Sequence, residues 1–352
     1  MTKKIRLLAD TSARSDKVGK VPQAVTLAMV ARAAGVSAST VSRILNGTAV
    51  VSDAKKRAIN DAIDQLGFIP NPVARGLAGG RTFSVGVLTQ TLDSPFYGAA
   101  LRGIEESLRG TGYSPLYVSG HWDAVEESRC LHLLRSRRVD GIIVLTGGLS
   151  DQALQLCART LPVVVTGRAL KAPGLYSLLF DDFGGGRLAT QHLIELGHRQ
   201  IAFIAGDNAH PDSIKRHAGY RAALEAAGIS YDPALVVSGA YTEDSGLEAV
   251  ENLLAAGQKF TALFAANDQM AVGASLGLYR RSIGVPQHIS VIGFDDAQFS
   301  AYTHPPLSTI HQPMLELGRL AAQALLQLLA GQKPTAKVPA PRLVARESTR
   351  QI

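Results

Sequence analysis

The sequence predicts a small all-α domain followed by two α/β lobes built on parallel, doubly wound sheets, and three observations carry this prediction. Residues 26–67 show helical periodicity broken by turn signals. From residue 83 onward, short β-branched runs alternate with helical windows, a pattern typical of parallel sheets that helices cover on both faces. This second pattern extends over about 260 residues, which exceeds one ordinary domain, so we expect two lobes.

The composition is that of a globular protein. The chain has 352 residues, of which 46% are hydrophobic and 18% are charged, so it can build packed cores and is not a disordered polyelectrolyte. Its two cysteines, Cys130 and Cys157, are too few for a disulfide framework or a four-ligand zinc site, and we expect no metal and no cofactor. No signal peptide and no membrane-spanning run is visible, which predicts a cytoplasmic protein.

The positive charge is concentrated at the N-terminal end. Residues 1–82 contain 13 Lys and Arg against 5 Asp and Glu, whereas the remaining residues contain 23 against 24. A basic module on a nearly neutral body predicts a polyanionic partner for that module, either nucleic acid or an anionic membrane. The membrane is disfavoured because the outward face of the module lacks bulky apolar residues.

Capping residues at the start of the periodic region define two short helices. Thr26 begins the first helix and Gly35 ends it, and Ser37 caps a second helix over 38–45. This is the spacing of a helix-turn-helix motif, whose second helix enters the major groove of DNA. Arg43 can donate two hydrogen bonds to one guanine, although any two helices separated by a glycine fit the same pattern. The predicted DNA contacts are Thr26, Ser37, Ala38, Ser39, Thr40, Ser42, Arg43 and Asn46.

A third helix completes this domain, for which we predict the bounds 26–70. It begins at 52–53 and ends at Gly67. Residues 1–25 show no periodicity and are predicted to form a flexible basic arm. Residues 71–82 start with prolines and finish with glycines, which predicts a linker with one possible turn of helix. The predicted inward residues of the third helix are Ala58, Ile59, Ala62, Ile63 and Leu66.

The predicted α/β region, residues 83–350, alternates strands with helices along its whole length. We predict strands at 84–89, 115–119, 141–146, 162–166, 200–205, 235–238, 261–265, 289–294 and 342–349. We predict helices at 95–110, 123–137, 150–159, 183–196, 212–227, 243–256, 268–282 and 313–331.

Ordered motifs along the chain resemble one protein family. The run VSASTVSRILN at 36–46 is followed by LGFIPN at 66–71 and VARGL at 73–77. Further motifs are SPFY at 94–97, VDG at 139–141, HLIELGHR at 192–199, RHAGY at 216–220, ANDQMA at 266–271, GFDD at 293–296 and PPLSTI at 305–310. Together they resemble the LacI/GalR family of bacterial transcription regulators over residues 26 to about 349.

The resemblance implies how such a protein meets DNA. Family members bind pseudo-palindromic double-stranded operators as dimers, and their linker forms a hinge helix that inserts a leucine into the minor groove. Leu77 matches that leucine, and Ala74 and Arg75 match the residues before it. Gly76 and the Ala78-Gly79-Gly80 run depart from the family pattern, so we expect a hinge that depends strongly on DNA. No heptad tail follows residue 349, and we expect a homodimer.

The resemblance also implies an effector site between two lobes like those of periplasmic sugar-binding proteins. The N-lobe is expected at about 83–180 plus 313–338, and the C-lobe at about 181–310 plus 339–350. A guanidinium, an amide and a carboxylate in one cleft with aromatic faces suit a sugar. Two arginines there also suit a sugar acid, and a purine or a phosphoprotein corepressor is the alternative. The predicted effector contacts are Phe96, Tyr97, Thr166, Arg168, Arg216, Tyr241, Asn267, Asp295 and Met314.

Four neighbouring residues are assigned structural roles. Asp182 and Asp268 are predicted to be N-caps of the helices that follow them. Tyr220 and Phe294 are predicted to lie in the core, and His210 at the rim of the cleft.

The function that these observations predict is an effector-controlled repressor of a carbohydrate-utilisation operon, located on the nucleoid. An enzyme is disfavoured, because the phosphate-loop, nucleophile-elbow and zinc-protease motifs do not occur and no catalytic residue is predicted. A sugar-binding module without a DNA role would explain residues 83–350 only.

Overall fold

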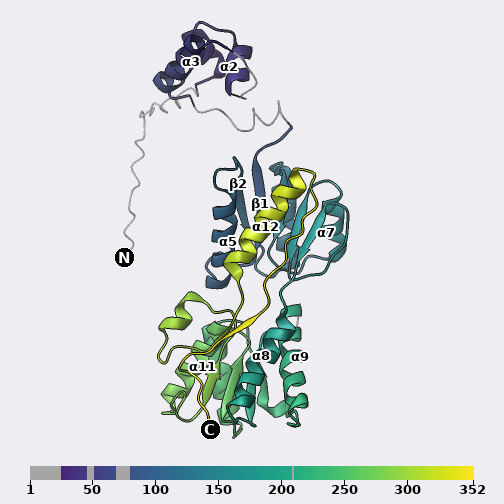
Figure 1. The fold of residues 1–352 in the computed structure, drawn as a ribbon, viewed down its shortest axis with the longest axis vertical. Coiled ribbons are helices and arrows are strands. Elements are labelled where there is room, and N and C mark those ends of the chain that lie inside the picture. The colour runs from purple at the N-terminus through teal and green to yellow at the C-terminus, as the bar shows by residue number, and fades with distance from the viewer. Residues whose placement is uncertain (1–24, 46–50, 69–79, 208–209) are drawn as a thin grey trace, which may run out of the picture. The chain divides into compact units, whose positions relative to one another are not determined.

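The structure is a computed structural model that describes residues 25–45, 51–68, 80–207 and 210–352. The chain divides into two units, Met1–Gly80 and Arg81–Ile352 (Figure 1). Several predictions lie outside the described residues: the arm except for Val25, the linker over 71–79, and the DNA contacts Asn46, Ala74, Arg75 and Leu77.

In the first unit, the three predicted helices are confirmed as α1 (Leu27–Ala33), α2 (Ala38–Leu45) and α3 (Asp53–Leu66). The Thr26 hydroxyl accepts a hydrogen bond from the backbone N–H of Met29 at 3.4 Å, so it caps α1 as predicted. At the other end of the unit, Gly67 closes α3 in the left-handed conformation, with φ of 62°.

A compact apolar core holds these helices together. Val30, Val41 and Ile59, one from each helix, are completely buried. Ala58, which was predicted to face inward, is exposed, because the buried face of α3 is the narrower row that contains Ile59 and Ala62. With so few buried side chains, each one matters for the position of α2.

The second unit begins with the N-lobe, a parallel sheet in the order β2-β1-β3-β4-β5. Its strands are β1 (Ser84–Thr89), β2 (Ser114–Ser119), β3 (Gly141–Val144), β4 (Val163–Thr166) and β5 (Leu175–Leu178). The helices are α5 (Pro95–Leu108), α6 (Ala124–Ser136), α7 (Asp151–Ala158) and α12 (Met314–Leu329). Alternate strand residues pack against α5 and α12 on one face, and against α6 and α7 on the other.

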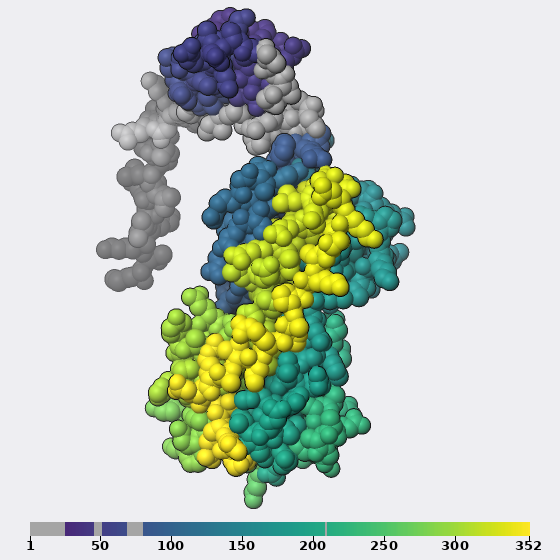
Figure 2. Space-filling model, viewed as in Figure 1, coloured from purple at the N-terminus to yellow at the C-terminus, as the bar shows by residue number. Residues whose placement is uncertain are grey.

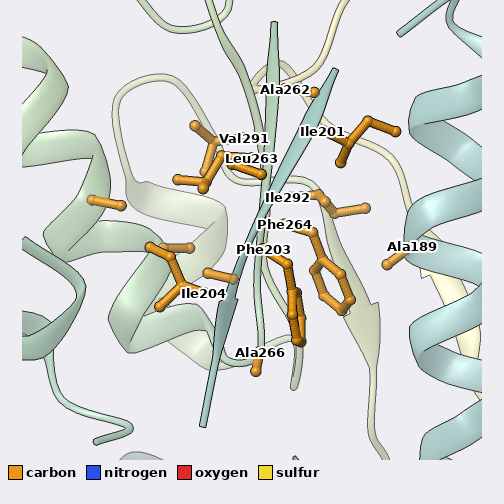
Figure 3. Packing of buried hydrophobic residues seen from close by; sticks show 14 of the residues in the cluster. Ala189, Ile201, Phe203, Ile204, Ala262, Leu263, Phe264, Ala266, Val291 and Ile292 are labelled. Atoms are coloured by element: carbon orange, nitrogen blue, oxygen red, sulfur yellow. The ribbon is translucent and has the colours of Figure 1, made fainter. Parts of the chain in front are cut away.

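The C-lobe repeats this design with a parallel sheet in the order β7-β6-β8-β9. Figure 3 shows Phe203 and Phe264 pointing to one side of this sheet and Ile204 and Leu263 to the other. Its strands are β6 (Ile201–Ala205), β7 (Val236–Ser238), β8 (Ala262–Ala265) and β9 (Ser290–Ile292). Its helices are α8 (Asp182–Glu195), α9 (Pro211–Ala226), α10 (Glu243–Ala255), α11 (Asp268–Arg280) and the short 3-10 helices η1 (Pro233–Leu235) and η2 (Gln298–Tyr302).

The chain passes between the lobes more than once. After the C-lobe sheet, β10 (Thr309–His311) leads into α12, which packs beside α5 in the N-lobe, and the chain then returns as β11 (Arg342–Val344), antiparallel to β10. Figure 2 shows this C-terminal segment, in yellow, running along the surface of both lobes. Neither β5 nor β10 was predicted, because their sequences, LYSL and TIH, contain no continuous apolar run.

Three helix pairs of the second unit cross where their backbones touch. At each crossing, one glycine from each helix faces a backbone carbonyl of the other, and a Cβ there would lie only 1.8–2.3 Å from that oxygen. A side chain would force the helices apart, so glycine is required at these positions. The pairs are Gly103 with Gly318 in α5 and α12, Gly186 with Gly219 in α8 and α9, and Gly246 with Gly273 in α10 and α11.

No helix among the described residues is long and apolar enough to cross a membrane.

Candidate functional site

Helix α2 presents the outward row that the sequence analysis assigned to DNA. Ala38, Ser39 and Arg43 are exposed, while Val41 is buried in the core of the first unit. The Ser37 hydroxyl accepts a hydrogen bond from the backbone N–H of Thr40 at 3.2 Å, which caps the helix. It also lies 2.8 Å from the hydroxyls of Ser39 and Thr40, so three predicted DNA contacts form one hydroxyl cluster at the N-terminus of α2.

The second unit contains a cavity of about 400 Å³ between its lobes. The N-lobe lines it with residues that follow β1 and β2, and the C-lobe with residues that follow β6, β7, β8 and β9. This is the position outside the carboxyl ends of parallel strands where ligands bind in open α/β sheets. A volume of this size suits a small organic ligand.

Six of the nine predicted effector contacts line this cavity: Phe96, Tyr97, Arg216, Tyr241, Asn267 and Asp295. Thr166, Arg168 and Met314 line a smaller adjoining pocket of about 40 Å³ instead. Phe96 and Tyr97 line both spaces.

Arg216 is a buried side chain of α9 whose nitrogens are all in use. Its Nε donates to Asp182 Oδ1 at 3.0 Å, and its Nη1 and Nη2 donate to the carbonyl of Ala266 at 2.6 Å and to Gln312 Oε1 at 3.0 Å. Its guanidinium lies 3.8 Å from the centroid of the Phe294 ring, a cation–π contact. Arg216 therefore holds parts of the C-lobe together at the floor of the cavity.

Asp295 is a cavity residue with an unsatisfied oxygen, as is Tyr241, whose hydroxyl also has no hydrogen-bond partner among the described residues. The Asp295 carboxylate is buried, Oδ1 lies 3.7 Å from Nη1 of Arg216, and that oxygen has no hydrogen-bond partner. Burial raises the pKa of Asp295 well above its usual range, and the Arg216 charge opposes that shift. Its backbone is in the left-handed region, with φ of 115°, and Asp296 follows with φ of 58°. This strained turn places a buried oxygen that lacks a donor at the lining of the cavity.

Asn267 performs the capping role that the sequence analysis gave to its neighbour. Its Oδ1 accepts from the backbone N–H of Met270 at 2.9 Å, which makes Asn267 the N-cap of α11, and its Nδ2 donates to the carbonyl of Tyr241 at 3.0 Å. The prediction for Asp268 was therefore wrong. The prediction for Asp182 was wrong in the same way, because Asp181 caps α8 and Asp182 is the buried partner of Arg216.

Asp268 ties the crossing segments to the C-lobe. Its carboxylate accepts from the hydroxyls of Ser300 and Thr309, both at 2.6 Å, and from the backbone N–H of Ala297 at 2.8 Å. Burial raises the pKa of Asp268 to about 6, although these hydrogen bonds oppose the shift. Because the folded protein holds this proton more tightly than the unfolded chain, the stability that it contributes is complete at low pH and lost as the pH rises through about 6.

The substitution Asp268→Asn removes that titration while keeping the shape of the side chain. The measured quantity is the free energy of unfolding of the wild type minus that of the variant. We expect this difference to fall by roughly 2–3 kcal/mol between acid pH and neutrality. Urea unfolding of both proteins across pH 3.8 to pH 6 and above measures this difference. A difference that stays constant with pH would contradict it.

An aromatic row crosses the cleft. Trp122 of the N-lobe stacks on His210 of the C-lobe with ring centroids 3.8 Å apart, and His210 lies parallel to Tyr241 at 5.7 Å. Tyr241 fits because Gly206 has no side chain, since a Cβ there would lie 2.1 Å from Cζ of the tyrosine. His210, predicted at the rim, thus bridges the aromatic surfaces of the two lobes.

The residues that line only the smaller pocket are committed to backbone contacts. Arg168 donates to the carbonyls of Gly147 and Leu149, and its Nη1 lies 3.4 Å from Asp151. The hydroxyl of Thr166 accepts from the backbone N–H of Thr146 at 3.1 Å. Both side chains fix the loop after β3, and Met314 is buried at the start of α12.

The sequence analysis missed several residues that line the cavity. All of them lie between a predicted strand and the predicted helix that follows it, or in the first turn of that helix, which is the signal that was available. Trp122 stands out, because it is the one tryptophan of the chain. The missed residues are Thr91, Asp93, Ser94, Trp122, Asp212, Ala240, Thr242, Glu243 and Gln269. Tyr220 and Phe294 are buried in the core as predicted.

Among the described residues, no group of three or more His, Cys, Asp or Glu side chains is placed to hold a metal ion.

Comparison with known proteins agrees with this architecture. Residues 26–71 match the family “Bacterial regulatory proteins, lacI family”, and residues 190–349 match the “Periplasmic binding protein-like domain”. The HTH-type transcriptional repressor PurR of Haemophilus influenzae is 35% identical over 336 residues, which cover 93% of this chain and 99% of PurR.

Solved structures give the same result. The lac repressor dimer bound to operator and the anti-inducer ONPF aligns with a TM-score of 0.84 and 31% identity, over 93% of this chain and all of that chain. The transcriptional regulator CelR in complex with cellobiose aligns with a TM-score of 0.69 and 35% identity, over 92% of this chain and 99% of that one. The resemblance and the fold class that the sequence predicted are confirmed. The chain belongs to the lacI family of bacterial regulatory proteins and is a DNA-binding transcriptional repressor.

Proposed function

We propose that this repressor binds a pseudo-palindromic operator of a carbohydrate-utilisation operon as a homodimer, and that a sugar in the cavity between its lobes changes operator affinity. Ligand and operator bind different units, so they influence each other through the linker that joins the units. A ligand shifts such an equilibrium only by its difference in affinity between the two states.

The observation that carries the ligand half of this proposal is the donorless Oδ1 of Asp295 at the floor of the cavity. A sugar hydroxyl is a suitable donor, and a buried acceptor without a partner is costly until one arrives. Phe96, Tyr97 and Trp122 add aromatic surface for the apolar face of a sugar ring. CelR, 35% identical to this chain, forms a complex with cellobiose.

The DNA half rests on the first unit. The exposed row of α2, with Arg43 in its last turn, has the chemistry for base edges, and residues 1–82 hold the excess of basic residues for phosphates. The lac repressor dimer, which shares the fold over the whole length of that chain, is bound to operator.

A purine is the second candidate effector. The row of Trp122, His210 and Tyr241 offers flat surfaces on which a base can stack, and the relative PurR is 35% identical.

The substitution Asp295→Ala separates the two halves. We expect the variant to bind DNA but to lose the response of DNA binding to the sugar, because the hydroxyl acceptor is gone. A thermal-shift screen of the full chain against sugars and purines first identifies the ligand, since specific binding raises the melting temperature by mass action. Gel shifts with the upstream region of the gene then compare both proteins.

A variant that keeps the full response would rule out this role for Asp295. Stabilisation by purines alone would replace the sugar with the second candidate.

A further inference from the structure

We propose that the cavity selects its ligand by charge: it accepts an uncharged or amino-bearing hydroxylated ring and rejects sugar acids and sugar phosphates. This inference rests on the proposed function, because it narrows the class of ligand that the same cavity binds. It removes the sugar acid that the sequence analysis left open.

The first observation is the charge of the lining. Among the described residues around the cavity, the carboxylates are Asp93, Asp212, Glu243 and Asp295, and the one cationic side chain is Arg216. Two acidic residues come from loops or strand ends and two from the first turns of α9 and α10. The lining stays acidic even when Asp295 carries a proton. An anionic ligand would thus enter a cavity of its own charge, which is strongly unfavourable.

The second observation is that Arg216 cannot offset this field for an incoming anion. Each of its three nitrogens donates to the protein, and its face lies against Phe294. Three carboxylates surround the guanidinium, with N···O distances of 3.0 Å to Asp182, 3.7 Å to Asp295 and 3.9 Å to Asp212. The guanidinium keeps N–H groups outside these three hydrogen bonds, but its positive charge is already offset by the three carboxylates around it, so it adds little attraction for a ligand carboxylate.

The third observation concerns the N-termini of α9, α10 and α11 at the cavity, which would otherwise attract an anion. The N-terminus of α5 also lines the cavity and carries no acidic residue in its first turn, but Asp93 lies just before it. The first turn of α9 carries Asp212, and that of α10 carries Glu243. The side chains of Thr242 and Asn267 already accept from backbone N–H groups in the first turns of α10 and α11. These ends are neutralised from within the protein.

The fourth observation is that a carboxylate oxygen of the lining lacks a donor, while the Tyr241 hydroxyl, which can donate or accept, also lacks a partner within the described part of the chain. Oδ1 of Asp295 calls for a hydroxyl or an ammonium donor. Asp212, whose side chain is 27% exposed, offers a further carboxylate at the same wall. The cavity therefore presents carboxylate acceptors to the ligand, and the charge of Arg216, its one cationic side chain among the described residues, is already paired with carboxylates.

The fluorescence of Trp122 reports the sign of the electrostatic potential in the cavity, even while the ligand is unknown. Trp122 is the one tryptophan of the chain, and it lines the cavity. In the full-length protein we expect collisional quenching of its fluorescence by iodide to be weaker than quenching by caesium. Both quenching constants are normalised to those of free N-acetyltryptophanamide. The ratio of caesium quenching to iodide quenching should then be about twofold or more, since an electrostatic potential of one kT already changes the local ion concentration by that order. Iodide quenching equal to or above caesium quenching would overturn the proposal.

A variant that removes one charge from the cavity, compared with a matched control, shows whether the difference in quenching arises from the cavity lining. We expect Asp212→Asn to move the ratio toward one, and Asp244→Asn to leave it unchanged, because Asp244 is exposed on α10 and does not line the cavity. Equal shifts in both variants would overturn the assignment to the cavity. The ratio of caesium quenching to iodide quenching in the wild type is enough to give the sign of the potential in the cavity. The proposal can therefore be tested even if a variant fails to fold.

Matched ligand pairs test the consequence. Calorimetry on the full chain compares D-glucose with D-glucuronate, D-ribose with ribose 5-phosphate, and D-glucosamine with D-glucuronate. We expect the anionic member of a binding pair to bind about tenfold or more weakly than its neutral partner. Preferred binding of an anion would overturn the charge selectivity and leave the proposed sugar effector standing. Binding of hypoxanthine in place of every sugar would overturn the proposed effector, while the quenching ratio still decides the field.

Discussion

Replacing Arg216 with alanine is expected to lower the free energy of unfolding of the second unit by about 3–5 kcal/mol, because it leaves buried ionic partners uncompensated. Asp182 is nearly completely buried, and burial already raises its pKa, with Arg216 as the main opposing influence. Gln312 and the carbonyl of Ala266 lose their donors as well. Urea denaturation of the full chain, followed by Trp122 fluorescence, measures the loss.

The control for this variant is Arg221→Ala on the same helix. Arg221 is exposed and lies 4.6 Å from the centroid of the Tyr231 ring, so its loss should cost about 1 kcal/mol or less. The double substitution Arg216→Ala with Asp182→Ala should recover part of the stability, because the most closely paired buried carboxylate, that of Asp182, is then no longer left without its partner. Equal losses in Arg216→Ala and Arg221→Ala would show that the buried network contributes little.

The second large effect is expected at the DNA-reading helix. Arg43→Ala should reduce discrimination between the operator and variants of one guanine position by about 1–3 kcal/mol, which is roughly fivefold to 150-fold in relative affinity. The reason is that a guanidinium can contact two acceptors of one guanine, and alanine contacts neither. Fluorescence anisotropy with a panel of labelled operator variants measures it.

The matched control is Arg57→Ala, which removes the same charge from an exposed position on α3. We expect any loss of affinity in this control to be uniform across operator variants, as for a phosphate contact. A variant at Arg43 that retains the wild-type ranking of operators would refute its role in base recognition.

The sequence predicted elements well where local rules decide them. Thr26, Ser37 and Gly67 act at helix ends as predicted, because caps depend on backbone groups within a few residues. The parallel strands were predicted because continuous apolar runs identify strands that are covered on both faces. The unpredicted β5 and β10 lack the continuous apolar run that gives this signal.

The site was predicted only in part because tertiary partners decide it. At Asp181-Asp182 and Asn267-Asp268, either residue of each pair fits the local rule for an N-cap. Asp182 is buried because it pairs with Arg216. Asp268 is buried because it accepts hydrogen bonds from the hydroxyls of Ser300 and Thr309. These partners lie more than 30 residues away, so no local pattern contains them.

Trp122 illustrates the same limit. Its place in the cleft depends on two consecutive residues in the left-handed region, His121 and Trp122, and on Gln90, whose Oε1 accepts from the Trp122 backbone at 2.7 Å. The sequence offers no sign of that turn. Only the structure shows that Trp122 lines the cavity.

The most direct test of the account is the linkage between ligand and operator. Once a ligand is identified, its Kd is measured by Trp122 fluorescence on the free protein and on the protein saturated with operator, and the operator Kd is measured with and without ligand. The account predicts one common factor, roughly 5- to 150-fold, because coupling between two binding sites is reciprocal. The account would be contradicted if saturating operator left the ligand Kd unchanged and saturating ligand left the operator Kd unchanged.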